Sequence, residues 1–172
     1  MTKDDKKYKK NSKALYNDIS IFINTIDYIK ETLGSVNDLV INLIDDPYKK
    51  EIFFDQEEEK SLGTLNELIK IIRNNVEQPV ETLISNFMNR TNFESLTDGA
   101  VSPSKYVGDI KDILRNAVNQ IRGKISDVFL TKILNHICQS INQAFINCIF
   151  KMKKISSNGV QQLYIGSFFL LN

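Results

Sequence analysis

A short polar break between two apolar helical patterns decides how this chain folds: residues 153–163 read KKISSNGVQQL. Serine and asparagine side chains can satisfy the free backbone groups at helix ends, and glycine tolerates left-handed dihedral angles. The break therefore predicts that a long helix ends near its start and that a second helix follows it. Two helices joined by so short a connection are typical of antiparallel neighbours in a bundle.

Upstream of the break, the apolar residues follow the period of an α-helix. They recur at steps of three and four over residues 15–33, 36–43, 65–87, 106–121 and 130–149, which lines one face of each helix. No segment shows the sustained alternation of a β-strand. The sequence therefore predicts an all-α fold, an antiparallel bundle of five or six helices.

Local signals predict where these helices begin and end. Gly34 is expected to end the first helix and Ser35 to cap a second one. Residues 45–60 contain an acidic run and are expected to form a solvated loop, after which the capping box at Thr64 starts the next helix. Pro79 lies inside that helix and is expected to kink or break it, because proline removes a donor and crowds the preceding turn.

Further signals mark the remaining boundaries. Residues 1–11 interleave lysine with aspartate and predict a disordered tail, so that the bundle spans residues 12–172. Ser102 and Pro103 predict the start of a helix, and Gly123 is expected to end or bend it.

Composition limits the classes of function. The 172 residues fit one domain, and the net charge of +1 provides no field that would gather nucleic acid. No apolar run approaches the roughly 20 residues that cross a bilayer, and no secretory signal is recognisable. The two cysteines, Cys138 and Cys148, point in different directions on one helical pattern, which favours a reduced, cytoplasmic setting.

The residue types that enzymes use are scarce. His136 is the single histidine and flanks an apolar stripe without a cysteine or acid at ligand spacing, so we interpret it as a boundary packing residue. Cys138 and Cys148 are expected to fill space in or near the core. No phosphate-binding glycine loop is present. We therefore expect neither catalytic residues, nor a metal site, nor a cofactor.

A cluster of lysines, Lys151, Lys153 and Lys154, lies where the longest helical pattern ends. Cations complement the negative end of a helix dipole, and this structural role is the favoured interpretation. The alternative is a basic rim that faces an acidic partner or anionic lipid.

The Lys-x-Ile-Ser-x-x-x-x-Gln-Gln-apolar run of residues 153–163 resembles a segment of the Sec-fifteen family, the Rab-effector subunits of the exocyst. Residues 80–92, 104–114 and 136–139 are similar to preceding helices of the family's carboxyl-terminal domain. After Gln162 the chain departs from the family, which commonly continues with Asn-Leu-Asp. The chain is also much shorter than family members, so we expect a truncated or divergent form.

The resemblance implies a function in vesicle traffic. Family members are rod-like tethers of stacked helical bundles without an active site, and their carboxyl-terminal bundle binds a GTP-loaded Rab GTPase. For this chain it implies docking of secretory vesicles, with other exocyst subunits and a GTP-bound Rab as partners, and a cytoplasmic location peripheral to vesicles or the plasma membrane. The residues expected to contact a partner are Lys151, Lys153, Lys154, Ile155, Ser156, Gln161, Gln162 and Tyr164, with Phe168 and Phe169 as further docking groups.

Two alternatives remain open from the sequence. In the first, the chain is a structural helical scaffold with no Rab or exocyst role, and its likeness to the tether comes from apolar periodicity alone. In the second, the lysine cluster and the apolar carboxyl end bind a lipid surface peripherally.

Overall fold

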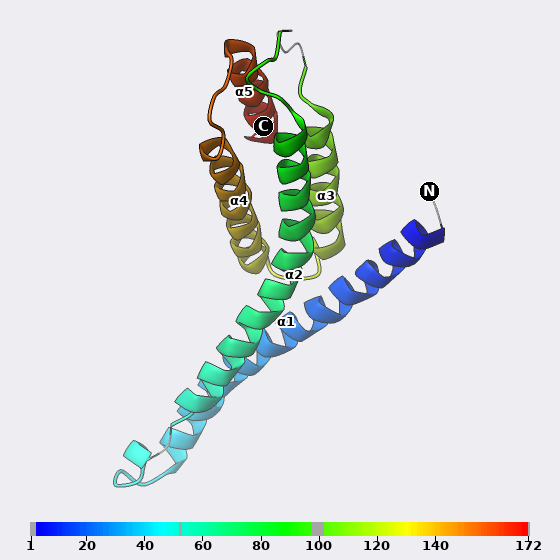
Figure 1. The fold of residues 1–172 in the computed structure, drawn as a ribbon. Helices are drawn as coiled ribbons and strands as arrows, with labels where there is room; N and C mark the ends of the chain where they lie inside the picture. The colour runs from blue at the N-terminus through cyan, green and yellow to red at the C-terminus, as the bar shows by residue number, and fades with distance from the viewer. Residues whose placement is uncertain (1–2, 52, 98–101, 172) are drawn as a thin grey trace. The chain divides into compact units, whose positions relative to one another are not determined.

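The computed structural model describes residues 3–51, 53–97 and 102–171 and is helical almost throughout (Figure 1). In chain order its elements are α1 (Lys3–Leu43), the 3-10 turn η1 (Lys49–Glu51), α2 (Asp55–Arg90), α3 (Lys105–Ile121), α4 (Asp127–Phe150) and α5 (Ser157–Leu171). The described ranges contain no strand. The prediction of an all-α helical bundle is therefore confirmed.

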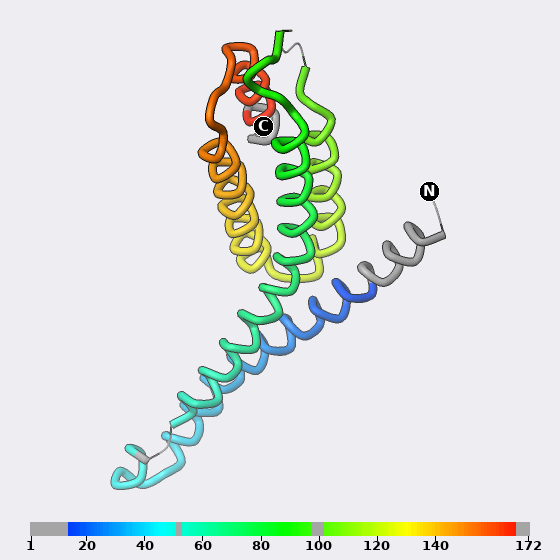
Figure 2. Tube along the Cα trace, in the orientation of Figure 1, coloured from blue at the N-terminus to red at the C-terminus, as the bar shows by residue number. Residues whose placement is uncertain are grey.

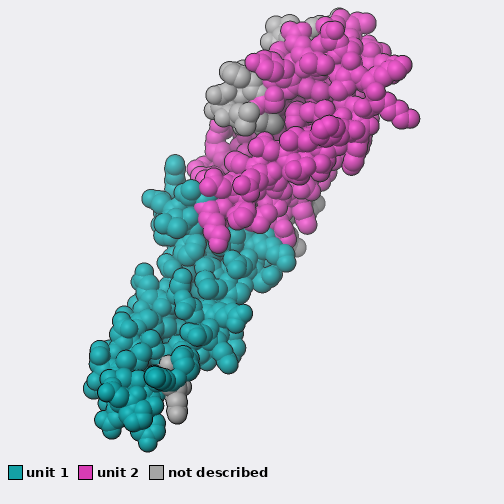
Figure 3. Space-filling view, turned by 90° about the vertical axis from the view of Figure 1, so that its left-hand side faces the viewer, with its two compact units in different colours: residues 1–72, 120–131 teal, residues 73–119, 132–172 magenta. Residues whose placement is uncertain are grey.

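The chain divides into two compact units, which Figure 3 shows in different colours. Unit 1 comprises residues 1–72 and 120–131, and unit 2 comprises residues 73–119 and 132–172. This differs from the single bundle that was expected over residues 12–172. Each unit has its own set of buried apolar side chains.

The core of unit 1 combines side chains from three parts of the chain. Ile19 and Ile23 of α1, Leu65 and Ile69 of α2, and Ile125 of the turn between α3 and α4 are all buried. Polar contacts hold that turn in place, because the Asn24 side chain donates to the Lys124 carbonyl at 2.7 Å and the Lys124 ammonium donates to the Asn17 side chain. Gly123 adopts a φ of 73° there, which confirms that it ends α3.

Unit 2 is a small antiparallel bundle. The second half of α2, α3 and α4 run in alternating directions, and α5 follows at the end of the chain (Figures 1 and 2). The most deeply buried side chains are aliphatic and come from three of these helices, namely Val76, Val80, Ile84, Val107, Ile110, Ile133 and Ile137. They repeat at helical spacing, as the sequence pattern predicted.

Several predicted boundaries are wrong because helical context outweighs local signals. α1 continues past Gly34 and Ser35 to Leu43, and the Ser35 hydroxyl bonds the Glu31 carbonyl of the previous turn instead of capping a helix. α2 already begins at Asp55, inside the expected loop over residues 45–60. Thr64 therefore lies within a helix, where its hydroxyl bonds the Lys60 carbonyl at 2.9 Å.

One further boundary differs from the sequence prediction, and two features of α2 bear on its predicted limits. α1 begins at Lys3, so residues 3–11 are helical where a disordered tail was expected. Acidic Asp55, Glu57 and Glu58 occupy the first turn of α2, where carboxylates stabilise the positive end of the helix dipole. α2 also continues through Pro79 without a break.

Candidate functional site

The α4–α5 junction, residues 151–156, is built by the ends of two helices. The last carbonyls of α4 are satisfied locally, because the Lys151 amide donates to Cys148 at 3.2 Å and the Met152 amide donates to Ile149 at 3.0 Å. Ser156 then caps α5, since its hydroxyl oxygen accepts the Gly159 amide at 3.1 Å. The sequence prediction of a helix break here is confirmed.

Backbone carbonyls of the segment after α2 hold the junction in place. The Phe93 carbonyl accepts the Ser156 amide at 2.9 Å and the Ser156 hydroxyl at 2.8 Å. The Asn158 side-chain amide donates to the Thr97 carbonyl at 2.7 Å and to the Leu96 carbonyl at 3.3 Å. Residues 93–97 therefore bind the start of α5 through main-chain oxygen atoms.

The same contact needs a residue without a side chain in α5. A Cβ atom on Gly159 would lie 2.7 Å from the Phe93 carbonyl oxygen and 2.9 Å from Cγ2 of Ile155. Real Cβ atoms do not approach backbone oxygen so closely. Gly159 thus allows α5 to lie directly against the segment after α2.

Gln162 extends this contact to the start of α3. Its side-chain amide donates to the Ser104 hydroxyl at 2.6 Å, and the Ser102 carbonyl lies 3.4 Å away. Ser104 also accepts the Val107 amide through its carbonyl, at 3.0 Å. Gln162 therefore links α5 to the first turn of α3.

Phe87, near the end of α2, contacts two other aromatic rings. Phe87 stacks on Tyr106 with ring centroids 4.2 Å apart, and its ring meets Phe93 edge-on at 5.6 Å. The Tyr106 hydroxyl is buried and has no hydrogen-bond partner in the described part of the chain. Desolvation by burial raises the pKa of Tyr106 to about 12. Sequence reasoning missed this cluster, because nothing in the local pattern indicates that the three rings meet.

The predicted contact residues separate into two groups. Ser156 and Gln162 are half-buried and are used in the internal contacts described above, and Ile155 is half-buried beside them. The others are exposed, namely Lys151, Lys153, Lys154, Gln161 and Tyr164. Phe168 and Phe169 lie outside the residues whose side chains the structure describes. The predicted contact residues therefore comprise a half-buried group that packs within the protein and an exposed group.

The exposed rim is basic and aromatic. Tyr164 is 68% exposed and Phe150, the last residue of α4, is 84% exposed. Lys154 lies 3.4 Å from Glu94, but both side chains are largely exposed, and such surface pairs contribute little to stability. We call Phe150, Lys151, Lys153 and Tyr164 the junction rim.

The groups considered for chemistry lie elsewhere. His136 is half-buried, in keeping with a boundary position. The expectation that both cysteines lie in or near the core is wrong for Cys138, which is exposed, and Cys148 is only half-buried. Among the described residues, no group of three or more His, Cys, Asp or Glu side chains could hold a metal ion.

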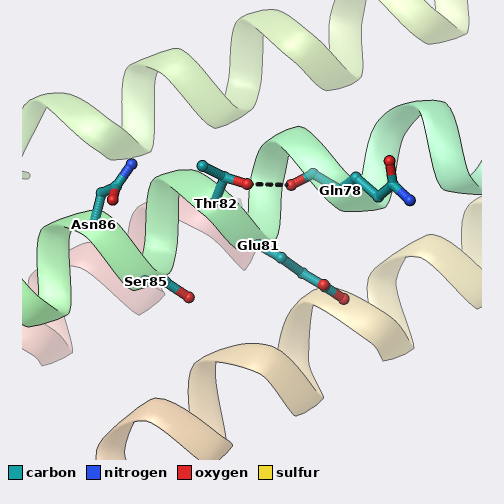
Figure 4. Close-up of a pocket in the computed structure, with 5 residues that line it drawn as sticks. All are labelled: Gln78, Glu81, Thr82, Ser85 and Asn86. Atoms are coloured by element: carbon teal, nitrogen blue, oxygen red, sulfur yellow. Dashed lines mark hydrogen bonds between the residues drawn. The ribbon is translucent and has the colours of Figure 1, made fainter.

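One shallow, open hollow lies on α2, lined by Gln78, Glu81, Thr82, Ser85 and Asn86 (Figure 4). The Thr82 hydroxyl donates to the Gln78 carbonyl at 2.8 Å, which is an ordinary contact within a helix. All five residues belong to one helix, and none of them is buried. The hollow is a polar helix surface and offers no enclosed site.

None of the described helices combines the length and the apolar character that a membrane crossing requires. The chain matches no protein-family model, no curated protein and no solved structure.

Proposed function

We propose that the protein is a non-catalytic binding component of a vesicle-tethering complex of the exocyst kind, and that it docks partner proteins through the junction rim. The observation that carries the proposal is the exposure of two aromatic side chains, Phe150 at the end of α4 and Tyr164 on α5, together with that of Lys151 and Lys153. Exposed aromatic anchors among polar residues are typical of binding hot spots.

The packing of the junction also supports this proposal. Three of the segments that resemble the Sec-fifteen family contact one another, because Phe87 of residues 80–92 stacks on Tyr106 of residues 104–114 and Gln162 bonds Ser104. These side chains give the rim a rigid base, which lowers the entropy cost of binding. The partners would be other exocyst subunits and a GTP-bound Rab, met on the cytoplasmic side of vesicles or the plasma membrane.

In the proposed mechanism, aromatic anchors bury against a helix or the switch surface of a GTPase. The lysines of the rim would accelerate encounter with an acidic partner, so that Lys153→Glu lowers the association rate more than it raises the dissociation rate.

A pull-down with the purified protein tests the proposal. We expect capture of exocyst subunits and stronger capture of GTP-loaded than of GDP-loaded Rab, with loss of both on Tyr164→Ala. Tyr48→Ala is the matched control, because Tyr48 is also well exposed but lies in unit 1. Equal capture of both nucleotide states together with no exocyst subunits would overturn the proposal.

The alternative of a structural helical scaffold is favoured by the internal contacts of Gln162. In that case, the double substitution Gln161→Ala and Gln162→Ala changes only the free energy of unfolding. Loss of partner binding by a double variant that melts as the wild type does would exclude it. Binding to lipid vesicles only when anionic lipid is present would instead indicate the peripheral lipid role.

A further inference from the structure

A row of large apolar side chains runs along the solvent side of α1. Every seventh residue of this helix is apolar, large and exposed, and the row consists of Leu15, Phe22, Ile29, Val36 and Leu43. Phe22 is 58% exposed and Leu43 is 84% exposed. We call this row, together with the exposed residues on one side of it, the outer face of α1; these flanking residues are Asp18, Ile21, Thr25, Tyr28, Thr32 and Leu39.

The flank of the row that belongs to the outer face is almost uncharged. Ile21, Tyr28 and Leu39 add further exposed apolar groups, and Thr25 and Thr32 lie between them. Among residues 14–43, whose side chains the structure describes, Asp18 is the one charged residue of the outer face, although a quarter of the whole chain is charged. Such a surface differs from an ordinary solvated helix face, which is rich in charge.

This row lies beside the residues that α1 uses in the core of unit 1. Ile19 and Ile23 are buried there, and Ile26, Leu33 and Val40 are half-buried. Ile19, Ile26, Leu33 and Val40 alternate with the exposed row at steps of four and three, which is the heptad pattern of a coiled coil. The positions of Ile19, Ile26, Leu33 and Val40 are at least partly covered within unit 1, whereas the row from Leu15 to Leu43 is exposed.

We propose that the outer face of α1 binds the same face of a second copy of the chain, with the two helices antiparallel. The exposed apolar side chains of the face amount to roughly 800 Å², which is about the area that each partner buries in a standard protein interface. An isolated surface of this kind is unusual, because exposed apolar patches on monomers rarely exceed about 600 Å².

The lack of charge favours a second copy over a different partner. In a twofold interface the same surface patch of both subunits is in contact, so the patch must not repel an identical patch. A face with a single carboxylate can pack against its copy without like-charge contacts. A charged partner, by contrast, would meet few opposite charges on this face.

The distribution of side chains favours the antiparallel orientation. The row is symmetric in spacing about Ile29, so an antiparallel pair places the large Phe22 near the smaller Val36 of the partner subunit. It also keeps Asp18 away from Asp18 of the partner subunit. A parallel pair would instead align Phe22 with Phe22 and Asp18 with Asp18, which is less favourable for packing and charge.

The mass of the protein in solution tests the proposal. Sedimentation velocity of the full chain should give twice the monomer mass of 19.7 kDa. Ile29→Glu places carboxylates at the centre of the apolar interface and should weaken the dimer about 100-fold or more. Lys30→Glu is the matched control, because Lys30 is the exposed neighbouring residue outside the row, and it should leave the dimer intact.

Circular dichroism separates loss of pairing from loss of folding. Both variants change exposed residues, so both should retain the helical signal of the wild type. The proposal is overturned by a wild-type monomer at about 100 µM, or by a dimer that Ile29→Glu and Lys30→Glu weaken equally.

Cysteine cross-linking tests the orientation. In a background with Cys138→Ser and Cys148→Ala, a mixture of Leu15→Cys and Leu43→Cys proteins should form a mixed disulfide dimer under mild oxidation. Leu15→Cys alone should not, because its two copies would lie about 42 Å apart along the helices. Efficient cross-linking of Leu15→Cys to itself would contradict the antiparallel pair.

Discussion

Replacement of Gly159 by alanine tests whether α5 is held by the Phe93 carbonyl. The added Cβ would lie 2.7 Å from that oxygen, so either the carbonyl or the start of α5 must move. The carbonyl accepts two hydrogen bonds from Ser156, at 2.9 Å from the amide and 2.8 Å from the hydroxyl. A displacement that relieves the clash therefore weakens both bonds.

The expected change in the free energy of unfolding is the sum of one stabilising and two destabilising contributions. Alanine in a helix gains about 1 kcal/mol over glycine through lower chain entropy. Two weakened hydrogen bonds cost about 1 kcal/mol each, and forcing an extra methyl group into packed structure costs about 1–3 kcal/mol. We expect a net loss of about 2–4 kcal/mol, which lowers Tm by about 6–12 °C in a chain of this size.

Gly108→Ala is the matched control. Gly108 lies inside α3, and a Cβ there would have no atom within 4 Å. Alanine should therefore stabilise the protein by about 0.5–1 kcal/mol and raise Tm by about 2 °C. Thermal unfolding followed by circular dichroism measures both variants.

A double-mutant cycle sharpens this test. If Gly159→Ala displaces the Phe93 carbonyl, Ser156→Ala should cost less in its presence than in the wild type, with a coupling of about 1 kcal/mol. Equal shifts of Tm for Gly159→Ala and Gly108→Ala, or strictly additive effects with Ser156→Ala, would refute the reasoning.

Three other substitutions test separate features of the fold. Ser156→Ala removes the cap of α5 and should lower the free energy of unfolding by about 1–2 kcal/mol in urea titration; an effect below about 0.3 kcal/mol would contradict the role of the cap. Gly123→Ala must adopt a φ of 73° and should destabilise by about 1 kcal/mol, so an unchanged Tm would count against that geometry. Tyr106→Phe removes a buried hydroxyl without a described partner and should stabilise the protein by about 1 kcal/mol. Because burial raises the pKa of Tyr106 to about 12, the phenol ionises in the unfolded chain before it ionises in the folded protein. The free energy of unfolding is therefore unaffected by this group below pH 10 and falls as the pH rises from 10 through 12; the Phe variant should show a smaller loss of stability over that range.

The sequence predicted the helical class of the fold because the apolar period extends over many turns. Ile133 and Ile137 of α4, for example, lie in the core as their spacing indicates. Boundaries were less predictable, because a cap acts over only a few residues. The capping box expected at Thr64 does not form, because the Thr64 hydroxyl is satisfied equally well inside a helix, where it donates to the Lys60 carbonyl. Gly34 likewise costs only about 1 kcal/mol within a helix, which packing on either side offsets.

The candidate site was predicted only in part. The polar break at residues 153–163 identified Ser156, because serine at a helix start has a defined chemical role. Its acceptor could not be identified, because the Phe93 carbonyl belongs to the main chain and has no signature in the residue type. The distinction between packed Gln162 and exposed Tyr164 likewise depends on the position of Ser104 and α3, which lies far away in the sequence.

The use of main-chain oxygen atoms at the junction has a consequence for how this part of the chain can evolve. Phe93, Leu96 and Thr97 contribute carbonyls there, so mutational drift at positions 96 and 97 leaves those acceptors in place. Insertion or deletion of one residue between Phe93 and Thr97 would instead move the acceptors out of register with Ser156 and Asn158. The length of this segment is therefore under tighter constraint than the identity of Leu96 and Thr97.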